Sequence, residues 1–479
     1  MRNGLFSHVS FEYVLIYYVL IKYAHIEFAH VELAQQVIGN PMSMIKQLST
    51  ADESFDTALT ALLAIQQDSH QEVYAAVRDI IDDVRRRGDV ALVELTSRFD
   101  RLNVTSAVDL EISKERMDHA LASIDDLVRG ALEASIDRVK RYHQEQRRAF
   151  GDQQDWKYED SYGNQLGQRV RPMQRVGIYV PGGKAAYPSS VIMTAIPARV
   201  AEVGEVILVV PTPDGQVNDV LLAAASLCGV DRLFTVGGAQ AVAALAYGTQ
   251  TIPKVDKIVG PGNIYVATAK EIVFGDVGID MIAGPSEVVI VADAGVDPEW
   301  LVMDMFAQAE HDELAQSVLI STDASVLSRV AQLIEVRLPG MARESIIRQS
   351  IGDRGALILT RDDAESAAIV NRIAPEHLEL ALTNADEFVE RVEHAGAIFV
   401  GSHSAEVVGD YSAGPSHVLP TSGTARFASA LGVYDFQVRS SIIRCSAAGS
   451  VALSRDAAIL ATEEGLEAHA RSAACRVQG

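Results

Sequence analysis

The amino-acid sequence predicts an α/β fold built on parallel sheets, and three observations support this prediction. From about residue 175 onward, short runs of apolar and β-branched residues alternate with stretches of helical periodicity. Several of the runs are apolar throughout, as strands buried on both faces of a sheet are. Glycine-rich loops follow some of the runs and lead into helices, which is the order expected of βαβ units.

The predicted strands cover residues 206–210, 232–236, 257–259, 288–292, 318–321, 356–360 and 397–400. Before about residue 150 the apolar spacing is that of helices. One helix face carries Val77, Ile80, Ile81 and Val84. Gly88, which follows three arginines, marks the end of that helix. From about residue 445 we expect a helix-rich tail without a strand.

Composition limits the class of protein. The 479 residues suggest about three domains at roughly 150 residues each. With 41 basic and 64 acidic residues the net charge is −23, which argues against a nucleic-acid partner because phosphate binding needs a basic face. An anionic cofactor held by backbone N–H groups stays compatible with this charge. The three cysteines form no CxxC pair, so we expect no disulfide framework, no thiolate zinc site and a cytoplasmic location.

The first 43 residues differ in sequence character from the rest of the chain. Residues 13–21 are apolar, but a bilayer span needs about 20 such residues, so no membrane association is expected. Arg2 is the only Lys or Arg residue before the run, and no clear cleavage site follows it, which disfavours a secretion signal. We interpret 1–43 as a translated leader outside the fold, with Met42 or Met44 as the true start, over a targeting segment.

Four glycine-rich loops fall within about a hundred residues. They are residues 180–183, 236–240, 260–263 and 283–287. Glycine there lets the backbone approach a ligand and aims helix N–H groups at a phosphate, but any single tight turn needs glycine anyway. None matches GxGxxG, so the ordinary dinucleotide fingerprint is absent. Their recurrence favours a nucleotide site at the carboxyl ends of strands.

A second group of candidates is polar. Asp297 followed by Pro298 predicts a helix start, and the helix is expected to run to Leu314. Gln308 and His311 then lie three apart on one face, where they can hold a metal ion or simply form a polar helix face.

Three further polar stretches follow. Glu376 and His377 are adjacent and can supply acid–base chemistry, or begin a helix in which Glu complements the dipole. Residues 409–417 form a polar loop that carries a carboxylate and an imidazole. Glu464 and His469 lie on the predicted tail helices. Periodicity does not show whether these residues meet in space.

Together these strings resemble the histidinol dehydrogenase family. The resemblance covers nearly everything after about residue 44 and rests on seven strings in order. They are residues 177–183, 237–240, 260–263, 284–287, 308–311, 375–378 and 409–411. The resemblance implies a zinc- and NAD-dependent four-electron oxidation of L-histidinol to L-histidine through L-histidinal, which consumes two NAD.

The resemblance also implies site residues. Zinc ligands would be Gln308, His311, Asp410 and His469. His377 would be the general base and Glu376 would activate water. NAD contacts would be Tyr179, Gln240 and Asn263. Substrate contacts would be Ser286, Gln308, His311, His377, Asp410, His417, Glu464 and His469. The metal donors are all nitrogen or oxygen, which does not match a closed structural zinc site.

In fold terms the resemblance implies two incomplete Rossmann-like domains and a homodimer in which the tail of one subunit completes the other's site. The expected parts are the 1–43 leader, a helical segment 44–74, a first domain 75–178 plus 286–431 with the metal and acid–base residues, a second domain 179–285 that binds NAD, and a swapped tail 432–479.

Two other functions remain open at this point. A paralogue could oxidise another polar alcohol, although residues 184–188 and the Glu464/His469 pair favour histidinol. An inactive, zinc-stabilised binding protein would not need both Glu376 and His377. Cys228 is interpreted as a core thiol rather than a nucleophile, because no cation or histidine is near it in sequence.

Overall fold

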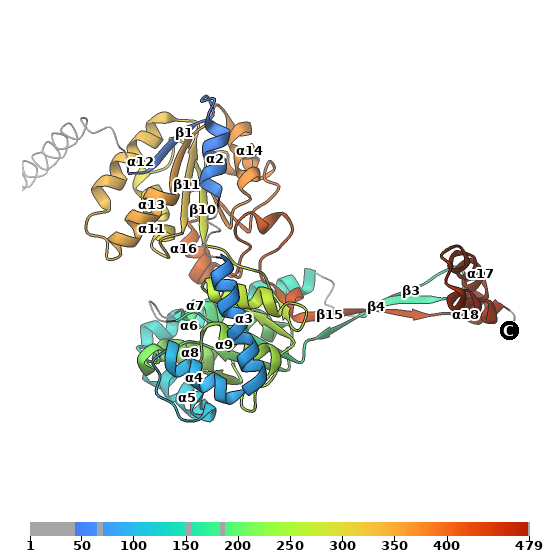
Figure 1. Cartoon of the computed structure of the whole chain (residues 1–479). Helices are drawn as coiled ribbons and strands as arrows, with labels where there is room; N and C mark the ends of the chain where they lie inside the picture. The colour runs from blue at the N-terminus through green and yellow to red at the C-terminus, as the bar shows by residue number, and fades with distance from the viewer. Residues whose placement is uncertain (1–43, 65–69, 150–154, 183–186, 478–479) are drawn as a thin grey trace, which may run out of the picture.

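The computed structural model describes residues 44–64, 70–149, 155–182 and 187–477, which form two α/β domains and a projecting arm (Figure 1). Two expectations lie outside the described residues: the leader at 1–43, and the preference for histidinol drawn from residues 184–186.

The first domain is built on a six-stranded parallel sheet. Its strands, in sheet order, are β1 (Lys46–Ser49), β12 (Ala356–Leu359), β11 (Gln316–Ser321), β10 (Glu287–Ala292), β13 (His377–Ala381) and β14 (Ala397–Val400). One face is covered by α11 (Pro298–Ala309), α12 (Ala324–Arg337) and α13 (Glu344–Arg354). The other is covered by α2 (Phe55–Leu63), α14 (Asp363–Ile373) and α15 (Ala385–Val389). The continuously apolar strands are therefore buried on both sides.

The second domain has the same construction. Its strands, in sheet order, are β2 (Glu111–Ile112), β7 (Arg232–Phe234), β6 (Glu205–Val209), β5 (Arg175–Tyr179), β8 (Lys257–Val259) and β9 (Gly278–Ile279), of which β2 is antiparallel. One face carries α3 (His70–Arg87), α4 (Asp89–Phe99), α9 (Gly238–Tyr247) and α10 (Ile264–Val273). The other carries α5 (Lys114–Ser123), α6 (Asp126–Ala149), α7 (Pro188–Val200) and α8 (Asp219–Leu227).

The two sheets share one strand order. When the five strands that follow each other along the chain are numbered from β5 or from β10, both sheets read 3-2-1-4-5, with one added strand beside strand 3. This is the Rossmann order without its sixth strand. The predicted fold class, two incomplete Rossmann-like domains, is confirmed.

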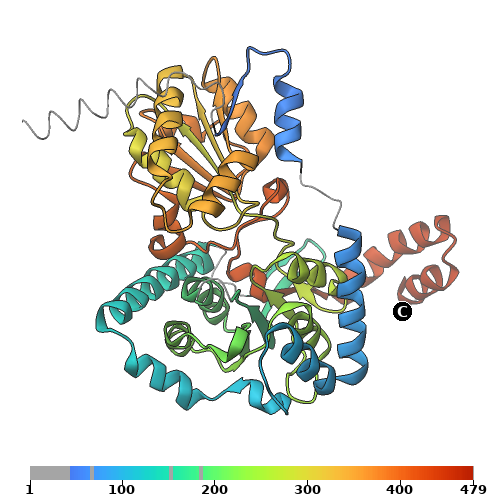
Figure 2. The ribbon, with the colours of Figure 1, turned by 60° about the vertical axis from the view of Figure 1, so that its left-hand side comes forward.

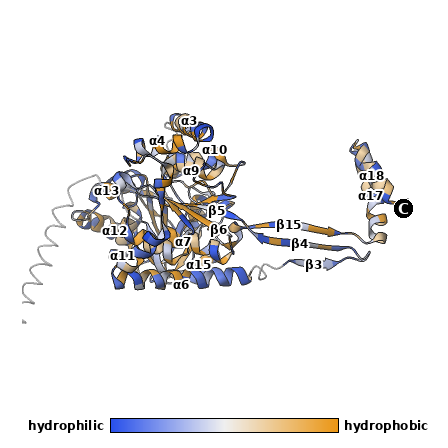
Figure 3. Cartoon of the chain, turned by 90° about the horizontal axis from the view of Figure 1, so that it is seen from below, coloured by the Kyte–Doolittle hydropathy of each residue, from blue (hydrophilic) through white to orange (hydrophobic). Residues whose placement is uncertain are grey.

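A three-stranded antiparallel ribbon projects from the second domain as an arm. It consists of β15 (Gln437–Arg444), β4 (Gln165–Pro172) and β3 (Trp156–Glu159), and it carries α17 (Ala447–Glu463) and α18 (Glu467–Val477) at its far end (Figures 1 and 3). The helical tail after about residue 445 is confirmed. The ribbon was not expected from the sequence, because its strands are mostly exposed or half-buried and lack apolar runs.

The domain division differs from the expected one. The segment 44–74 contributes strand β1, which pairs with β12 of the first domain, and α2. Residues 75–178 do not join the first domain, because β2 pairs with β7 and β5 lies between β6 and β8. Figure 2 shows α2 on one domain and α3 on the other. Element order along a chain does not reveal which of two similar sheets an element joins.

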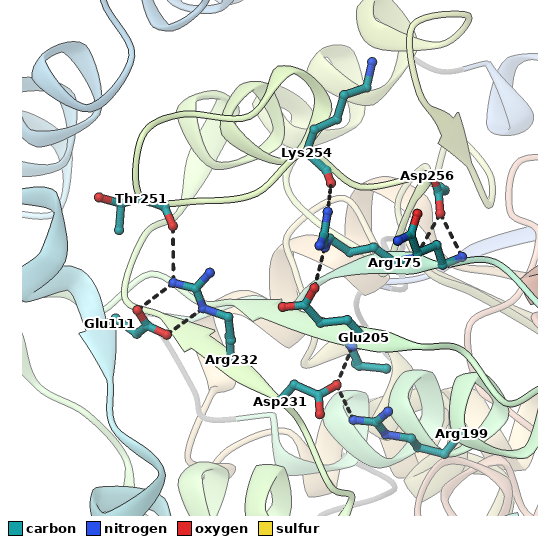
Figure 4. Close-up of polar contacts among 11 residues, drawn as sticks. Glu111, Arg175, Arg199, Glu205, Asp231, Arg232, Thr251, Lys254 and Asp256 are labelled. Atoms are coloured by element: carbon teal, nitrogen blue, oxygen red, sulfur yellow. Dashed lines mark hydrogen bonds and ion pairs between the residues drawn. The ribbon is translucent and has the colours of Figure 1, made fainter.

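Arginine–carboxylate pairs occupy the amino end of the second sheet (Figure 4). The pairs are Arg175–Glu205 at 2.5 Å, Arg199–Asp231 at 2.5 Å and Arg232–Glu111 at 2.7 Å. Each is partly exposed, so each contributes about 0–1 kcal/mol to stability. The opposite, carboxyl end is the one at which open α/β sheets bind ligands.

The connection between the sheets fixes how the two domains face each other. β9 ends at Ile279 and β10 begins at Glu287, so residues 280–286 lead from the carboxyl end of one sheet to the amino end of the other. The glycine loops of the second domain therefore face the starts of β10 and β13.

A buried ion pair holds the beginning of that connection. Lys270 Nζ donates to the Gly260 carbonyl at 2.9 Å and pairs with Asp280, and Asp280 Oδ2 accepts from the Gly260 N–H at 2.7 Å. Gly260 has φ +109°, which a residue with a side chain rarely adopts. The pair thus fixes the loop at 260–263.

We expect Lys270→Met to lower the free energy of unfolding by about 3–5 kcal/mol, because it leaves the buried Asp280 carboxylate unpaired. Arg86→Met, which removes an exposed partner of Asp83, is the matched control and should cost less than about 1 kcal/mol. Urea denaturation followed by circular dichroism measures both. Equal losses for the two variants would show that the Lys270 pair has no special role.

Candidate active site

Gln308 and His311 lie at the end of α11. The predicted helix start is confirmed, since the Asp297 side chain accepts the Glu299 N–H and Pro298 is the first helical residue. The helix ends at Ala309 rather than at Leu314, and His311 lies in the turn beyond it. Gln308 is fully buried, yet its Oε1 and Nε2 have no partner among the described residues. A buried unpaired amide costs about 1–3 kcal/mol, so this side chain is placed to meet a ligand.

Glu376 and His377 stand at the amino end of β13, so the alternative of a helix start is wrong. Ala374, just before them, has φ +51° in the left-handed region, which is strained for a residue with a Cβ. Glu376 is tied to Glu287 at the start of β10 by two hydrogen bonds. The Glu287 N–H donates to Glu376 Oε2 at 3.0 Å, and the Glu376 N–H donates to Glu287 Oε1 at 3.3 Å.

The two nitrogens of His377 have different surroundings. Nδ1 lies 3.1 Å from the Glu287 carbonyl oxygen and donates to it. Nε2 lies 3.7 Å from Asp410 Oδ1 and is a buried atom without a hydrogen-bond partner among the described residues. The strand pairing therefore orients the ring and leaves Nε2 for a reacting group.

Asp410 lies on a π-helical turn, Gly409–Ala413, that continues α16 (Glu406–Val408), where a polar loop was expected. Such turns are frequent at functional sites. His417 returns to the same place, with its Nδ1 3.1 Å from the Asp410 carbonyl oxygen. Asp410, His377 and His417 are thus brought together, and His311 is close enough to Asp410 for their charges to interact.

Glu406 is a site residue that sequence reasoning missed. Its Oε1 lies 3.7 Å from His377 Nδ1, and its Oε2 is buried without a partner among the described residues. Glu406, His377 and Asp410 each offer one ligand atom, and these atoms lie within 4.8 Å of one another. The signal was available in the spacing of Glu406 and Asp410, since two acids four residues apart share a face when the chain is helical.

Burial and charge shift the pKa values of the site. Burial raises the pKa of Glu376 to about 8. Burial opposes a charge on His377, but Glu406, Glu376 and Asp410 together raise its pKa well above the usual range. Burial lowers the pKa of His311 and of His417. Burial favours a higher pKa for Asp410 as well, but the surrounding histidines lower it.

The predicted cofactor residues lie at the carboxyl edge of the second sheet. Tyr179 ends β5, and its hydroxyl accepts the Gly238 N–H at 3.1 Å. Gln240 is buried in the first turn of α9. Asn263 is exposed and caps α10, where its Oδ1 accepts from the N–H groups of Tyr265 and Val266. Two glycine loops and two helix starts therefore converge on this edge, as a dinucleotide requires.

Ser286, Glu464 and His469 complete the predicted set. Ser286 directly precedes β10, beside Glu287. Glu464 and His469 are exposed on the helices of the arm, which Figures 1 and 3 show far from both sheets. One chain therefore brings His311, His377, Asp410 and His417 together, with Gln308 one turn before His311, but not the two arm residues. Cys228, in contrast, is buried in the core, and burial raises the pKa of its thiol.

The donor set fits a divalent metal ion. Gln308 has both of its polar atoms unpaired among the described residues, and His311 and Asp410 are near enough for their charges to interact. Imidazole, amide and carboxylate donors of this kind suit zinc at a site that keeps positions open for substrate.

Comparison with known proteins assigns the family. A family model described as histidinol dehydrogenase matches residues 63–477. The chain belongs to the histidinol dehydrogenase family. Histidinol dehydrogenase from Pseudomonas aeruginosa is 57% identical over 433 residues, 90% of this chain and 97% of its own. That of Dechloromonas aromatica is 56% identical over 437 residues, 91% and 100% of the two chains.

A solved histidinol dehydrogenase structure from Elizabethkingia anophelis covers 92% of this chain with a TM-score of 0.83 and 30% identity, and this chain covers 99% of it. Membership of the histidinol dehydrogenase family identifies the chain as an enzyme, an oxidoreductase. Among the described residues, no helix has the length and apolar character needed to span a membrane.

Proposed function

We propose that the chain oxidises L-histidinol to L-histidine through L-histidinal, with two NAD, as the final step of histidine biosynthesis in the cytoplasm. The observation that carries this proposal is the buried, unpaired His377 Nε2 beside Asp410, with Glu376 on the Nδ1 side of the same ring, in a chain 57% identical to a histidinol dehydrogenase. The alternatives of another alcohol or of an inactive zinc protein have no observation in their favour.

Zinc is the proposed metal, and its ligands in one subunit would be Gln308, His311 and Asp410. When bound, zinc would hold the imidazole and amino nitrogens of histidinol and so orient the alcohol carbon. Occupation of Asp410 would also remove one of the three carboxylate charges that keep a proton on His377, and so lower the pKa of that ring toward the range of a base.

His377 carries out the first step. Its Nε2 takes the proton of the substrate hydroxyl as the adjacent carbon loses hydride. The nicotinamide of NAD, bound at Tyr179, Gln240 and Asn263, supplies the hydride acceptor. Ser286, His417 and the Glu464 of a second subunit would contact the substrate. The hydrogen bond from Nδ1 to the Glu287 carbonyl keeps Nε2 directed at the hydroxyl.

Glu376 serves the second step. An aldehyde has no hydroxyl proton, so water must add before a second hydride can leave. Glu376 would take the proton of that water, and the resulting hydrate loses hydride to the second NAD to give the carboxylate. Because burial raises the pKa of Glu376 to about 8, this base becomes available as the pH rises through that value.

The arm argues for a homodimer. A thin ribbon has no core of its own, and it exposes large apolar side chains on both of its parts. These include Trp156, Tyr158, Val438, Ile443, Ile459 and Leu460. We propose that the arm packs on a second subunit and brings Glu464 and His469 into its site, with His469 as the fourth zinc ligand.

The function is tested by NADH formation with histidinol before and after chelation. We expect about two NADH per histidinol, loss of activity with a chelator that strips zinc, and recovery when zinc is added back. Absorbance at the NADH band gives the yield. No NADH from zinc-replete protein would contradict the proposal, and activity only with another alcohol would favour the paralogue.

The shared site is tested by mixing two inactive variants, His377→Ala and His469→Ala. His377→Ala should lose hydride transfer but keep its zinc, because His377 is not a proposed ligand. After unfolding and refolding together, mixed dimers should regain activity, since one of their two sites combines an intact core with an intact arm. If each site is built from a single chain, mixing restores nothing. Mixing His377→Ala with Glu376→Gln, both core variants, is the matched control and should show no more activity than the Glu376→Gln protein in the mixture shows alone.

We expect Glu376→Gln to slow the aldehyde step more than the alcohol step and to remove the rise of the aldehyde step with pH near 8, because the amide cannot take a proton from water. Stopped-flow NADH traces with histidinol and with histidinal separate the two steps. Equal slowing of both steps would contradict this role.

A further inference from the structure

The carboxyl edge of the second sheet contains two buried polar atoms that the site described above does not use. They are Asp100 Oδ2 and Thr212 Oγ1, and neither has a hydrogen-bond partner among the described residues. Asp100 is only 7% exposed and Thr212 only 3%. A polar atom this deeply buried without a hydrogen-bond partner destabilises the folded state, unless a bound ligand supplies the partner.

Asp100 lies directly against the glycine loop of the expected NAD site. It follows the last residue of α4, and its carboxylate accepts the N–H of Gly237. The hydroxyl of Tyr179 accepts the next N–H, that of Gly238. A Cβ on Gly237 would come within 2.3 Å of Pro211 Cβ, so the loop after β7 packs closely on the loop after β6. Asp100 and Thr212 thus share one corner of the sheet edge.

The strand order indicates which part of a dinucleotide would bind at this corner. In sheets of order 3-2-1-4, the diphosphate of a dinucleotide lies at the loop after strand 1, and an acid at the end of strand 2 accepts the ribose hydroxyl. Here strand 2 is β6, which ends at Val209 and continues as Val210-Pro211-Thr212-Pro213 without an acid. Asp100 reaches the same place from α4, because its carbonyl accepts the Asp214 N–H of that loop at 2.8 Å.

A purely structural role fits Asp100 less well. The nearest cation is Arg101, but its guanidinium is engaged by Asp214 at 2.7 and 2.6 Å. Among the described residues, the Gly237 N–H donates to the carboxylate and Oδ2 has no partner, and burial raises the pKa of Asp100 to about 6, so near neutral pH it is an ionised acceptor.

We propose that Asp100, assisted by Thr212, accepts the ribose hydroxyls of the adenosine half of NAD and excludes NADP by repelling its 2′-phosphate. This inference rests on the proposed use of NAD. It names a specificity-determining residue that no glycine fingerprint indicates, since the acid comes from a helix about eighty residues before the first glycine loop.

The test is the affinity of the zinc-loaded, full-length protein for NADH and for NADPH, measured by fluorescence titration in the absence of substrate. Asp100→Asn should weaken NADH binding about tenfold, because a hydrogen bond to a charged acceptor is lost, and weaken NADPH binding less. The preference for NADH over NADPH should therefore narrow, by less than about tenfold. Asp214→Asn removes the same charge from an exposed neighbour and should change either affinity less than about twofold.

If Asp100→Asn and Asp214→Asn bind NADH with the same affinity and bind NADPH with the same affinity, the inference is overturned while the proposed function is left intact. A wild-type protein that binds no NADH would overturn both. Unchanged histidinol binding and an unchanged melting temperature confirm that Asp100→Asn is folded. If Asp100→Asn does not fold, Thr212→Val is the test variant. This isosteric change should weaken NADH binding about threefold, and unchanged NADH affinity would overturn the inference.

Discussion

The pairing of β10 with β13 is the constraint on which the whole site depends. The register places Glu287 opposite Glu376, and each residue donates its N–H to the other's carboxylate. The same pairing gives His377 Nδ1 the Glu287 carbonyl as its acceptor. The proposed base His377, the proposed water-activating Glu376 and the orientation of both therefore depend on one strand pair, which follows directly after Ala374 in the left-handed region.

The two domains contribute opposite edges of similar sheets. The second sheet offers its carboxyl edge, as open α/β sheets usually do, and its amino edge carries ion pairs. The first sheet offers its amino edge, because residues 280–286 join the two edges directly. Under the proposed function, this opposition would let one sheet hold the cofactor and the other hold the substrate against it.

Sequence periodicity predicted the buried strands well because burial on both faces leaves an uninterrupted apolar run. It missed the elements whose form depends on partners far along the chain. The start of β13 resembles a helix start until β10 pairs with it, and the arm has no apolar run because it packs on neither sheet. The polar motifs of the sequence pointed to Gln308, His311, Glu376, His377 and Asp410. The roles inferred for Glu406 and Asp100 depend instead on the residues that the fold places beside them.

The buried acids of the first domain finally bear on the proposed metal site. Burial raises the pKa values of Glu287, Glu376, Glu379 and Glu406, which lie on neighbouring strand ends and α16. The Glu406 N–H also donates to Glu379, so these carboxylates form one connected group. Raised pKa values mean that these acids keep their protons to a higher pH than exposed carboxyl groups do, which limits the buried charge. In the proposed enzyme, a divalent ion at Asp410 would add positive charge and so favour the ionised form of the carboxyl groups around His377.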